Sequence, residues 1–547
     1  MAGEGRVKKS PLPPANRRPP MTGKELAMNV GTLWTKTART FPDRLAIACG
    51  DYEWTYRQAD GRINRLANAL RRLGIRKGSN VAILLHNCPE FIEALFACFK
   101  AGIGSVPINF RLHPKECSFI IDNSEAEAVI LGEDFQDSLH ALRGEMPRVK
   151  HYICITEPLE GMLGYEGLIK DQFPTFADEE VERDHLAWLF YTSGTTGRPK
   201  GAMLTHHNLL VMTMNFFADM CPLGPEDGIL HAAPLSHGSG LYCLPNVAKG
   251  AANIILKSKT FAPKIVFETI QRRRVTNIFM APAMIKRLIL SPEIDRYDLS
   301  SLKCINYGGA PILVEDLKAA VKKMGQVFVQ LFGQAEAPMT ISYLRKEEHL
   351  LEGTEEQMRR LTSAGIPRTD LEVKIVDDMD RDLPPGKMGE IVVRGEVVMK
   401  GYWKNPEATA ETLKGGWLHT GDLGIMDEKG YVYILDRAKD MIISGGENIY
   451  SREIEDVIIK HPAVLEVAVI GVPDEKWGES IKAIVSLREG KKATEEEIIS
   501  FCKEYLASYK KPKSVEFIDA IPKNAYGKVL KRELREKYWT GEARRVR

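Results

Sequence analysis

A regular alternation of short apolar segments with amphipathic helical segments constrains the fold of this chain more than any other feature of its sequence. One apolar helical face ends at Gly74, and residues 81–85 then form an apolar run that is typical of a buried strand. Similar runs, each predicted to be a strand, recur at residues 105–108, 128–131, 229–232, 253–256, 277–280 and 303–307. This alternation predicts an α/β fold built from parallel βαβ units, with helices on both faces of the sheets.

The pattern of apolar residues changes beyond about residue 371, which indicates that a subdomain and a further domain follow the α/β part. Two alternating segments, 372–376 and 390–394, predict a small antiparallel β subdomain that closes the large domain. A smaller α+β pattern follows, with a helix at 451–461, a strand at 467–471 and a helix at 494–510. The predicted parts are a disordered basic, proline-rich tail at 1–22, a large domain at 23–436, a hinge at 437–440, a small domain at 441–540 and a basic tail at 541–547. The large domain is predicted to start with a helix that carries Leu26, Val30 and Leu33.

Length and composition narrow the class of protein. A chain of 547 residues is too long for one hydrophobic core, and a net charge of +2 gives no indication of nucleic-acid binding. The nine cysteines include no CxxC pair, so we expect reduced thiols. No apolar run reaches the ~18 residues of a membrane span, and the first residues lack the apolar segment of a signal peptide. We therefore expect a cytoplasmic protein.

The stretch from Tyr191 to Asn208 has the composition of a phosphate-binding loop. It reads YTSGTTGRPKGAMLTHHN and follows an apolar run, 186–191, that predicts a strand. Glycines let the backbone approach a ligand, while N–H groups and hydroxyls donate to anionic oxygens. It is not a Walker A loop, because only two residues separate Gly194 from Gly197 and Pro199 directly precedes Lys200.

This stretch resembles the signature loop of the adenylate-forming enzymes, which include acyl-CoA synthetases, peptide-synthetase adenylation domains and luciferases. The resemblance covers about residues 25–540, in a large adenylation domain and a mobile lid domain. It implies an acid–thiol ligase that uses ATP, Mg²⁺ and CoA. A carboxylate attacks the α-phosphate of ATP and releases pyrophosphate, and the acyl-adenylate then passes its acyl group to CoA with release of AMP. The resemblance leaves the oligomeric state open, with a homodimer as one option.

The resemblance also implies which residues bind ATP and AMP. Phe332 would stack on adenine, Asp422 would accept hydrogen bonds from both ribose hydroxyls, and Arg437 would reach ribose or phosphate unless it only pairs with Asp436 at the surface. The full set of expected ATP- and AMP-binding residues is Thr192, Ser193, Gly194, Thr195, Thr196, Gly197, Lys200, Gly308, Gly309, Ala310, Gln330, Leu331, Phe332, Gly333, Asp422, Ile434, Arg437 and Lys528.

Three residues are the expected catalytic groups: Lys528, Glu336 and Thr196. Glu336 and Thr196 would be the Mg²⁺ ligands, since Mg²⁺ takes one or two protein ligands together with phosphate oxygens. Lys528 would orient the substrate carboxylate and stabilise the adenylation transition state as a point charge. Ala335 departs from the family pattern, which has threonine there. That departure keeps open a non-catalytic nucleotide-binding relative.

The remaining expected roles concern the acid, the hinge and CoA. His237, Gly238 and Gly308 would line the acid pocket, although a core histidine is a close alternative for His237. We hypothesise that Gly238, Ser239 and Gly240 leave room for a bulky or long acyl chain. Lys439 is the predicted hinge. The predicted CoA channel consists of Ser444, Gly445, Gly446 and Glu447.

The sequence does not identify the acid. The resemblance favours a medium- or long-chain fatty acid, with an aryl acid as the alternative, and a third option is an adenylating enzyme with a different acceptor. Domain rotation about the hinge is expected to present Lys528 for the first half-reaction and the glycine-rich loop for the second.

Overall fold

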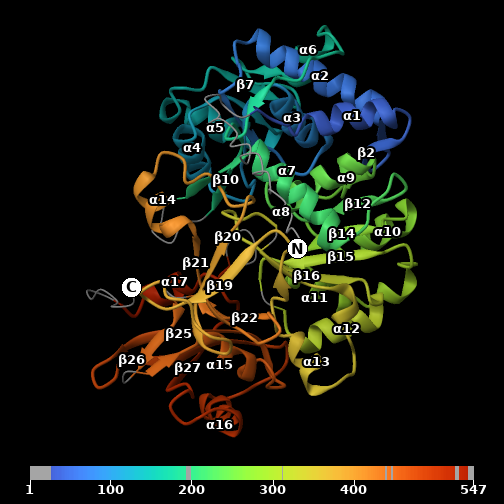
Figure 1. Ribbon diagram of the computed structural model, residues 1–547. Coiled ribbons are helices and arrows are strands. Elements are labelled where there is room, and N and C mark those ends of the chain that lie inside the picture. Colours follow the sequence, from blue (N-terminus) through green and yellow to red (C-terminus); the bar gives the residue numbers. More distant parts are fainter. Residues whose placement is uncertain are drawn as a thin grey trace, which may run out of the picture.

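The computed structural model describes residues 26–192, 199–310, 312–339, 341–437, 440–444, 447–523 and 529–539. The chain forms two large α/β layers followed by two smaller sheets (Figure 1). In Figure 1 the blue and cyan segments of the first layer lie above the green and yellow second layer, and the orange and red carboxyl-terminal sheet lies below both. The predicted α/β class with parallel sheets is confirmed.

The first large sheet has seven strands in the order β11-β10-β5-β4-β6-β7-β8, all parallel except β11. Helix α3 (Pro89–Lys100) is buried on every side, since it contacts strands of both large sheets and the helix α2 (Tyr56–Arg72). That position explains why its sequence is apolar all round, with phenylalanine at 91, 96 and 99. The strands are β4 (Asn80–Leu84), β5 (Gly104–Pro107), β6 (Ala126–Leu131), β7 (His151–Cys154), β8 (Leu163–Gly164), β10 (Leu186–Thr192) and β11 (Lys200–Thr205).

The second large sheet has nine strands in the order β18-β17-β16-β15-β14-β12-β13-β2-β3. Its six central strands are parallel, and β17, β18 and β3 are antiparallel additions at the edges. The strands are β2 (Leu45–Cys49), β3 (Tyr52–Thr55), β12 (Gly228–His231), β13 (Ala252–Ile255), β14 (Asn277–Met280), β15 (Cys304–Gly308), β16 (Phe328–Phe332), β17 (Ser342–Leu344) and β18 (Ile366–Pro367).

The strand order of the second sheet predicts where a ligand binds. From β12 the chain moves to β13 on one side, and it then returns to β14 on the other side of β12. Open α/β sheets bind ligands at such a reversal, outside the carboxyl ends of the strands. The segment with His237 follows β12, Gly308 ends β15, and Phe332 ends β16. All three predicted site residues therefore lie at this edge.

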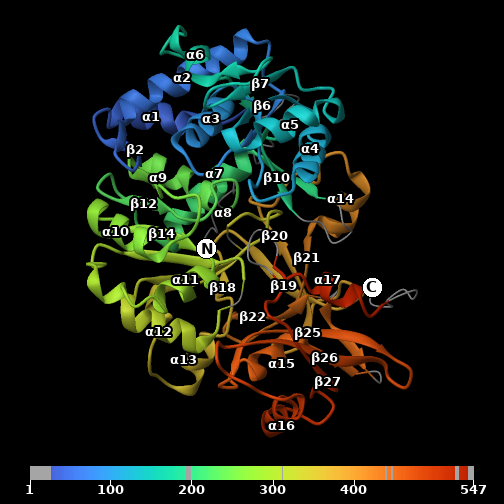
Figure 2. The same ribbon diagram turned by 180° about the vertical axis from the view of Figure 1, so that it is seen from behind.

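Two smaller sheets complete the fold, and Figure 2 shows them from behind. An antiparallel four-stranded sheet contains β19 (Glu372–Val376), β20 (Met388–Arg394), β21 (Leu418–Met426) and β22 (Val432–Arg437). The carboxyl-terminal sheet contains β23 (Ile442–Ser444), β24 (Glu447–Ile449), β25 (Val464–Asp474), β26 (Gly478–Leu487) and β27 (Ser514–Phe517), with helices α15 (Ser451–Ile458) and α16 (Glu495–Tyr505).

Several predicted boundaries are wrong. Leu26 belongs to the short strand β1 (Leu26–Ala27), and the first helix, α1, runs from Thr32 to Thr40. Leu26 pairs with Glu182, which lies far away in the sequence, so its local helical spacing was misleading. The helix predicted to reach residue 461 ends at Ile458, and the one predicted at 494–510 is confined to α16.

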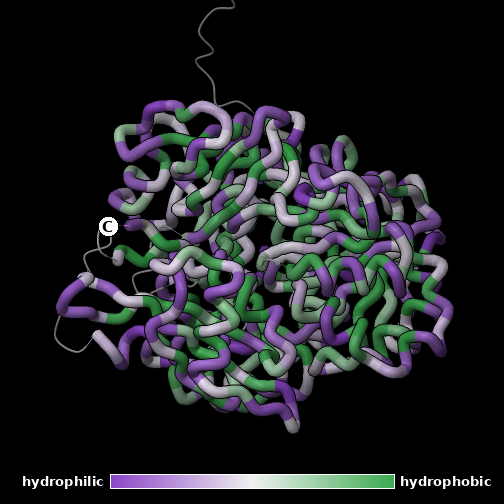
Figure 3. The backbone as a smooth tube through the Cα atoms, turned by 90° about the horizontal axis from the view of Figure 1, so that it is seen from below, coloured by the Kyte–Doolittle hydropathy of each residue, from purple (hydrophilic) through white to green (hydrophobic). Residues whose placement is uncertain are grey.

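Most of the buried side chains are apolar. Figure 3 shows hydrophilic stretches along much of the outer edge of the tube and hydrophobic stretches concentrated further inside. The largest apolar cluster joins the two α/β layers around Trp34, Trp188 and the helix α3. Among the described residues, no helix combines the length and apolar character that crossing a membrane requires.

Candidate active site

The predicted phosphate loop connects two antiparallel strands. Strand β10 ends at Thr192, which pairs across the ladder with Lys200 at the start of β11. A Walker loop leads from a strand into a helix, whereas this segment leads from a strand into a strand. The exclusion of a Walker site is therefore confirmed. Ser193, Gly194, Thr195, Thr196 and Gly197 lie outside the described residues, so their predicted roles stay predictions.

Lys200 and Glu336 are brought to the same place by Tyr402. The hydroxyl of Tyr402 donates to Oε1 of Glu336 at 2.5 Å. The Nζ atom of Lys200 lies 5.2 Å from the centre of the Tyr402 ring, within the range of a cation–π contact. The predicted phosphate lysine and the predicted metal carboxylate thus share one aromatic neighbour.

Backbone hydrogen bonds hold this arrangement together. The segment around Tyr402 extends the hairpin, because the amide of Trp403 donates to the carbonyl of Gly201 at 2.8 Å and the amide of Met203 donates to the carbonyl of Gly401 at 2.9 Å. The carbonyl of Glu336 in turn accepts from the amide of Met399 at 2.7 Å. Sequence reasoning missed Tyr402. The only available signal was its place in a Gly-Tyr-Trp run before an Asn-Pro turn.

The site fits a magnesium ion that is shared with a phosphate. Glu336 is half-buried, so its carboxylate is within reach of solvent. Mg²⁺ in nucleotide sites keeps several waters and takes one or two carboxylates together with phosphate oxygens. A single carboxylate beside a lysine therefore suffices for a metal–phosphate complex, which would hold the phosphates and neutralise their charge.

The residues predicted to meet adenine lie at the ends of two adjacent parallel strands. Gly308 is the register partner of Leu331, and a Cβ at Gly308 would lie 2.3 Å from the carbonyl oxygen of Leu331. Glycine is required there by this close approach. Gly309 follows with φ of +79°, a left-handed conformation that suits glycine. Gly309 and Ala310, which follow the end of β15, are both exposed to solvent. Gln330 lies on β16 and Gly333 directly follows it.

Asp422 is held by a residue that the sequence reasoning did not select. Gln334 donates from Nε2 to Oδ2 of Asp422 at 2.6 Å and to the carbonyl of Thr420 at 2.9 Å. The amide of Asp422 donates to the hydroxyl of Thr420 at 3.1 Å. Because Gln334 lies between Gly333 and Glu336, one short segment links the predicted ribose carboxylate with the predicted metal carboxylate. Arg437 is the register partner of Asp422 across β21 and β22, where Ile434 also lies.

His237 lies between the two large sheets, directly before the short helix α8 (Gly238–Leu241). Its ring centre is 5.0 Å from that of Phe190 on β10. Burial lowers the pKa of His237 to about 4, so its imidazole is neutral at neutral pH. A neutral, half-buried ring is suited to contact an uncharged part of a substrate.

The glycines beside His237 are tightly packed. A Cβ at Gly240 would lie 2.0 Å from the carbonyl oxygen of Leu235, and one at Gly238 would lie 3.1 Å from the ring of Phe279. Whether Gly238, Ser239 and Gly240 leave room for a bulky or long acyl chain stays a prediction. These glycines let the backbone and an aromatic ring come close.

The predicted CoA loop forms a hairpin. Ser444 ends β23 and pairs with Glu447 at the start of β24, and Ser444 also pairs with Gly478 of β26. Gly445 and Gly446, which join the two strands, lie outside the described residues. So do Lys439 and Lys528.

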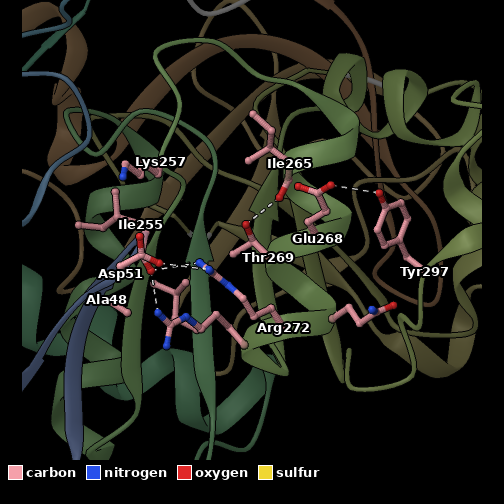
Figure 4. Close-up of a pocket in the computed structure, with 13 residues that line it drawn as sticks. Ala48, Asp51, Ile255, Lys257, Ile265, Glu268, Thr269, Arg272 and Tyr297 are labelled. Atoms are coloured by element: carbon pink, nitrogen blue, oxygen red, sulfur yellow. Dashed lines mark hydrogen bonds and ion pairs between the residues drawn. The ribbon is translucent and has the colours of Figure 1, made fainter.

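A separate surface pocket of about 560 Å³ lies against β2, β13 and helix α10 (Pro263–Arg273) (Figure 4). Several of its polar groups are paired: Nη1 of Arg272 lies 3.5 Å from Oδ1 of Asp51, and Glu268 accepts from the hydroxyl of Tyr297 at 3.3 Å. None of the predicted site residues is among the residues that line it. We assign no role to this pocket.

Comparisons with known proteins agree with this geometry. The family model described as AMP-binding enzyme matches residues 34–403, and the model described as AMP-binding enzyme C-terminal domain matches residues 453–528. A feruloyl-CoA synthase of Amycolatopsis is 40% identical over 512 residues, covering 93% of this chain and 99% of that protein. A medium/long-chain-fatty-acid–CoA ligase of Mycobacterium tuberculosis is 33% identical over 536 residues, covering 94% of this chain and 91% of that protein.

Among solved structures, an anthranilate CoA ligase in complex with anthranoyl-AMP superposes with a TM-score of 0.85 at 28% identity, covering 93% of this chain and 97% of that one. The matching models, the strand-to-strand phosphate hairpin and the grouping of Lys200, Tyr402 and Glu336 agree with one another. The chain belongs to the AMP-binding enzyme family, as an AMP-forming acyl- or aryl-CoA ligase of the adenylate-forming superfamily.

Proposed function

We propose that this ligase activates an aryl acid and transfers it to CoA. The observation that carries this proposal is the aromatic surroundings of His237 and Gly238. Phe190 lies against His237, Phe279 lies against Gly238, and the ring of Tyr242 stacks on Phe279 with centroids 5.2 Å apart. Aromatic rings pack well against a planar ring. The relative at 40% identity is named for an aryl acid, which supports the same class.

The proposed roles follow the expected ones. The 193–197 loop and Lys200 hold the β- and γ-phosphates, Glu336 holds Mg²⁺ with Thr196, and Asp422 and Arg437 bind the ribose. Lys528 reaches the carboxylate and the α-phosphate, while Lys439 is the hinge between a large and a small domain. Ser444 and Glu447 flank the turn that would line the CoA channel. The contacts of Tyr402 with both Glu336 and Lys200 support the roles proposed for these two residues.

A medium- or long-chain fatty acid is the second candidate. The relative at 33% identity is named for such acids. The aromatic rings of Phe190 and Phe279 beside His237 and Gly238 favour the aryl acid over it. Both candidates use the same two half-reactions.

A screen of acids separates these possibilities. Pyrophosphate release is measured over aromatic acids and over fatty acids of graded length, with and without CoA, and AMP release is followed in parallel. We expect aromatic acids to give the highest kcat/KM and AMP release to require CoA. Highest activity with a fatty acid would overturn the aryl assignment, and full turnover without CoA would overturn the thiol acceptor.

A further inference from the structure

Three buried polar side chains lie on the face of the second sheet that carries the proposed acid pocket. They are Tyr242, which begins the helix after α8, Asn306 on β15, and Arg368, which follows β18. Each has at least one buried polar atom without a hydrogen-bond partner in the described chain: the hydroxyl of Tyr242, both amide atoms of Asn306, and Nη1 and Nη2 of Arg368.

The ring of Phe279 connects Tyr242 and Asn306 with the proposed pocket. Tyr242 stacks on Phe279, and Phe279 is the register partner of Asn306 across β14 and β15. The same ring is the one that approaches Gly238. The orphan hydroxyl and the orphan amide are therefore grouped around the aromatic ring that forms one wall of the proposed pocket.

Arg368 approaches this group from the other side. Its Nε donates to Oδ2 of Asp219 at 2.9 Å. Asp219 belongs to the π-helical turn η3 (Phe216–Met220), whose Phe216 packs edge-on against Tyr242 with centroids 5.8 Å apart. The charge of Arg368 opposes the rise that burial imposes on the pKa of Tyr242, as expected for close neighbours.

Buried polar atoms without a hydrogen-bond partner, such as those of Tyr242, Asn306 and Arg368, are unusual in a folded protein. Buried polar groups in native proteins are almost always paired, because an unpaired one keeps its full desolvation penalty. The neighbouring residue Tyr307 obeys this rule: its hydroxyl lies 3.0 Å from Nε2 of His349 on the opposite face of the sheet. The side chain of Asn306 makes a contact of hydrogen-bond type with the thiol of Cys304, which is a weak partner, and its amide atoms have no stronger partner among the described residues.

We propose that Tyr242, Asn306 and Arg368 form the far end of the acid pocket and bind a hydroxyl group on the aromatic ring of the substrate, remote from the reacting carboxylate. This inference rests on the proposed function. A hydroxyl both donates and accepts, so it can satisfy the carbonyl oxygen of Asn306 as well as the N–H groups of Asn306 and Arg368.

A second carboxylate is a poorer occupant. Asp219 already neutralises Arg368, and Asp219 itself accepts from the amide of Thr369 at 3.0 Å and from its hydroxyl at 2.7 Å. A further buried negative charge would find no uncompensated cation among these residues, and burying an unpaired charge is costly. The three residues therefore select a neutral hydrogen-bonding group.

The test compares four acids that differ at one ring position: 3-phenylpropenoic acid and its 4-hydroxy, 4-methoxy and 4-carboxy derivatives. The measured quantity is kcat/KM for CoA-dependent AMP formation. We expect the 4-hydroxy acid to exceed the unsubstituted acid by about tenfold or more, because a site built for a hydroxyl rejects the analogue that lacks it. The 4-methoxy acid should fall between them, since it only accepts, and the 4-carboxy acid should be worst.

Tyr242→Phe and Asn306→Leu should each reduce the ratio of kcat/KM for the 4-hydroxy acid to kcat/KM for the unsubstituted acid, because each removes a hydrogen-bonding partner of the ring hydroxyl. Tyr307→Phe is the matched control on the opposite face, and it should leave the preference unchanged. Thermal melting checks that each variant is folded.

The outcomes separate this inference from the proposed function. If aromatic acids turn over but the wild type does not favour the hydroxyl, or the variants lower activity with both acids equally, this inference is overturned and the aryl assignment stands. If no aromatic acid turns over, the proposed function fails, and this inference fails with it.

Discussion

Two regions of this molecule bury polar groups in opposite ways. At the top of Figure 1, where helices α2, α3 and α6 (Tyr165–Lys170) pack together, the buried carboxylate of Glu93 accepts from Nε of Arg62 at 2.5 Å and from the hydroxyl of Tyr165 at 2.7 Å. The buried ammonium of Lys100 lies 2.9 Å from Asp60 in the same region. Burial still raises the pKa of Glu93, which shows how strongly this carboxylate depends on its partners.

The face of the second sheet near Tyr242 and Asn306 differs, because the polar atoms there lack partners within the described chain. In the first region the chain supplies partners for the buried charges of Glu93 and Lys100, so these charged groups fix how the helices pack. In the second region the hydroxyl of Tyr242 and two guanidinium nitrogens of Arg368 have no partner among the described residues. This difference suggests a general interpretation: a buried polar side chain with a hydrogen-bond partner stabilises the packing of the fold, and one without a partner indicates a ligand-binding site.

The largest expected effect follows from breaking the paired region. Glu93→Ala leaves Nε of Arg62 and the hydroxyl of Tyr165 without their acceptor, although Arg62 keeps its ion pair with Glu166, and should lower the free energy of unfolding by about 3–5 kcal/mol, the combined cost of two buried donors without a partner. Urea denaturation followed by fluorescence measures this. Glu93→Gln keeps an acceptor and should cost less, and equal losses in the two variants would contradict the role given to the charge.

An intermediate effect is expected at Tyr402, whose hydroxyl is paired at a site open to ligand. Tyr402→Phe removes the hydrogen bond to Glu336 while retaining the ring beneath Lys200. A hydrogen bond to a charged group contributes about 1.5–3 kcal/mol, so kcat/KM for adenylation should fall by about 10- to 100-fold.

Pyrophosphate release and the melting temperature together test this expectation. The melting temperature should stay nearly constant, since Glu336 is half-buried and can be solvated. Unchanged adenylation would show that Tyr402 does not position the carboxylate.

The smallest effect compares the two regions directly, through the same substitution in each. Tyr165→Phe removes a hydroxyl that donates to Glu93 and should destabilise the protein by about 1–2 kcal/mol. Tyr242→Phe removes an orphan hydroxyl and should leave the ligand-free protein unchanged or more stable by up to about 1 kcal/mol. Parallel melting curves measure the difference, and equal destabilisation by both substitutions would remove the distinction between the regions.

Much of the fold was predictable because its signals are local. The strands at 277–280 and 372–376 and the helix at 89–100 have the predicted boundaries, since a buried strand or helix records its surroundings in its own hydrophobicity. Leu26 was assigned wrongly because its partner, Glu182, lies far away in the sequence. The predicted end of α15 was wrong because apolar spacing continues past Ile458 after the helix has stopped.

The residues of the candidate site also fall into two groups, those that the sequence could identify and those that only their contacts in the structure reveal. Lys200, Glu336 and Asp422 could be selected from the sequence, since each lies in a short contiguous segment that resembles a motif of the family. Tyr402 and Gln334 could not, because their importance comes from the side chains that they contact.

The sequence by itself determined the α/β class, the family resemblance and the order of the segments that carry the chemistry, because each of these is written in contiguous residues. Only the tertiary structure decided that Tyr402 contacts both Lys200 and Glu336, the latter 66 residues away from it in the sequence. The same holds for Tyr242, Asn306 and Arg368, which keep polar atoms without partners in the described chain. Sheet register and helix packing set these contacts, and both depend on residues that are distant in the chain. Whether a buried polar group is paired is a property of the folded molecule.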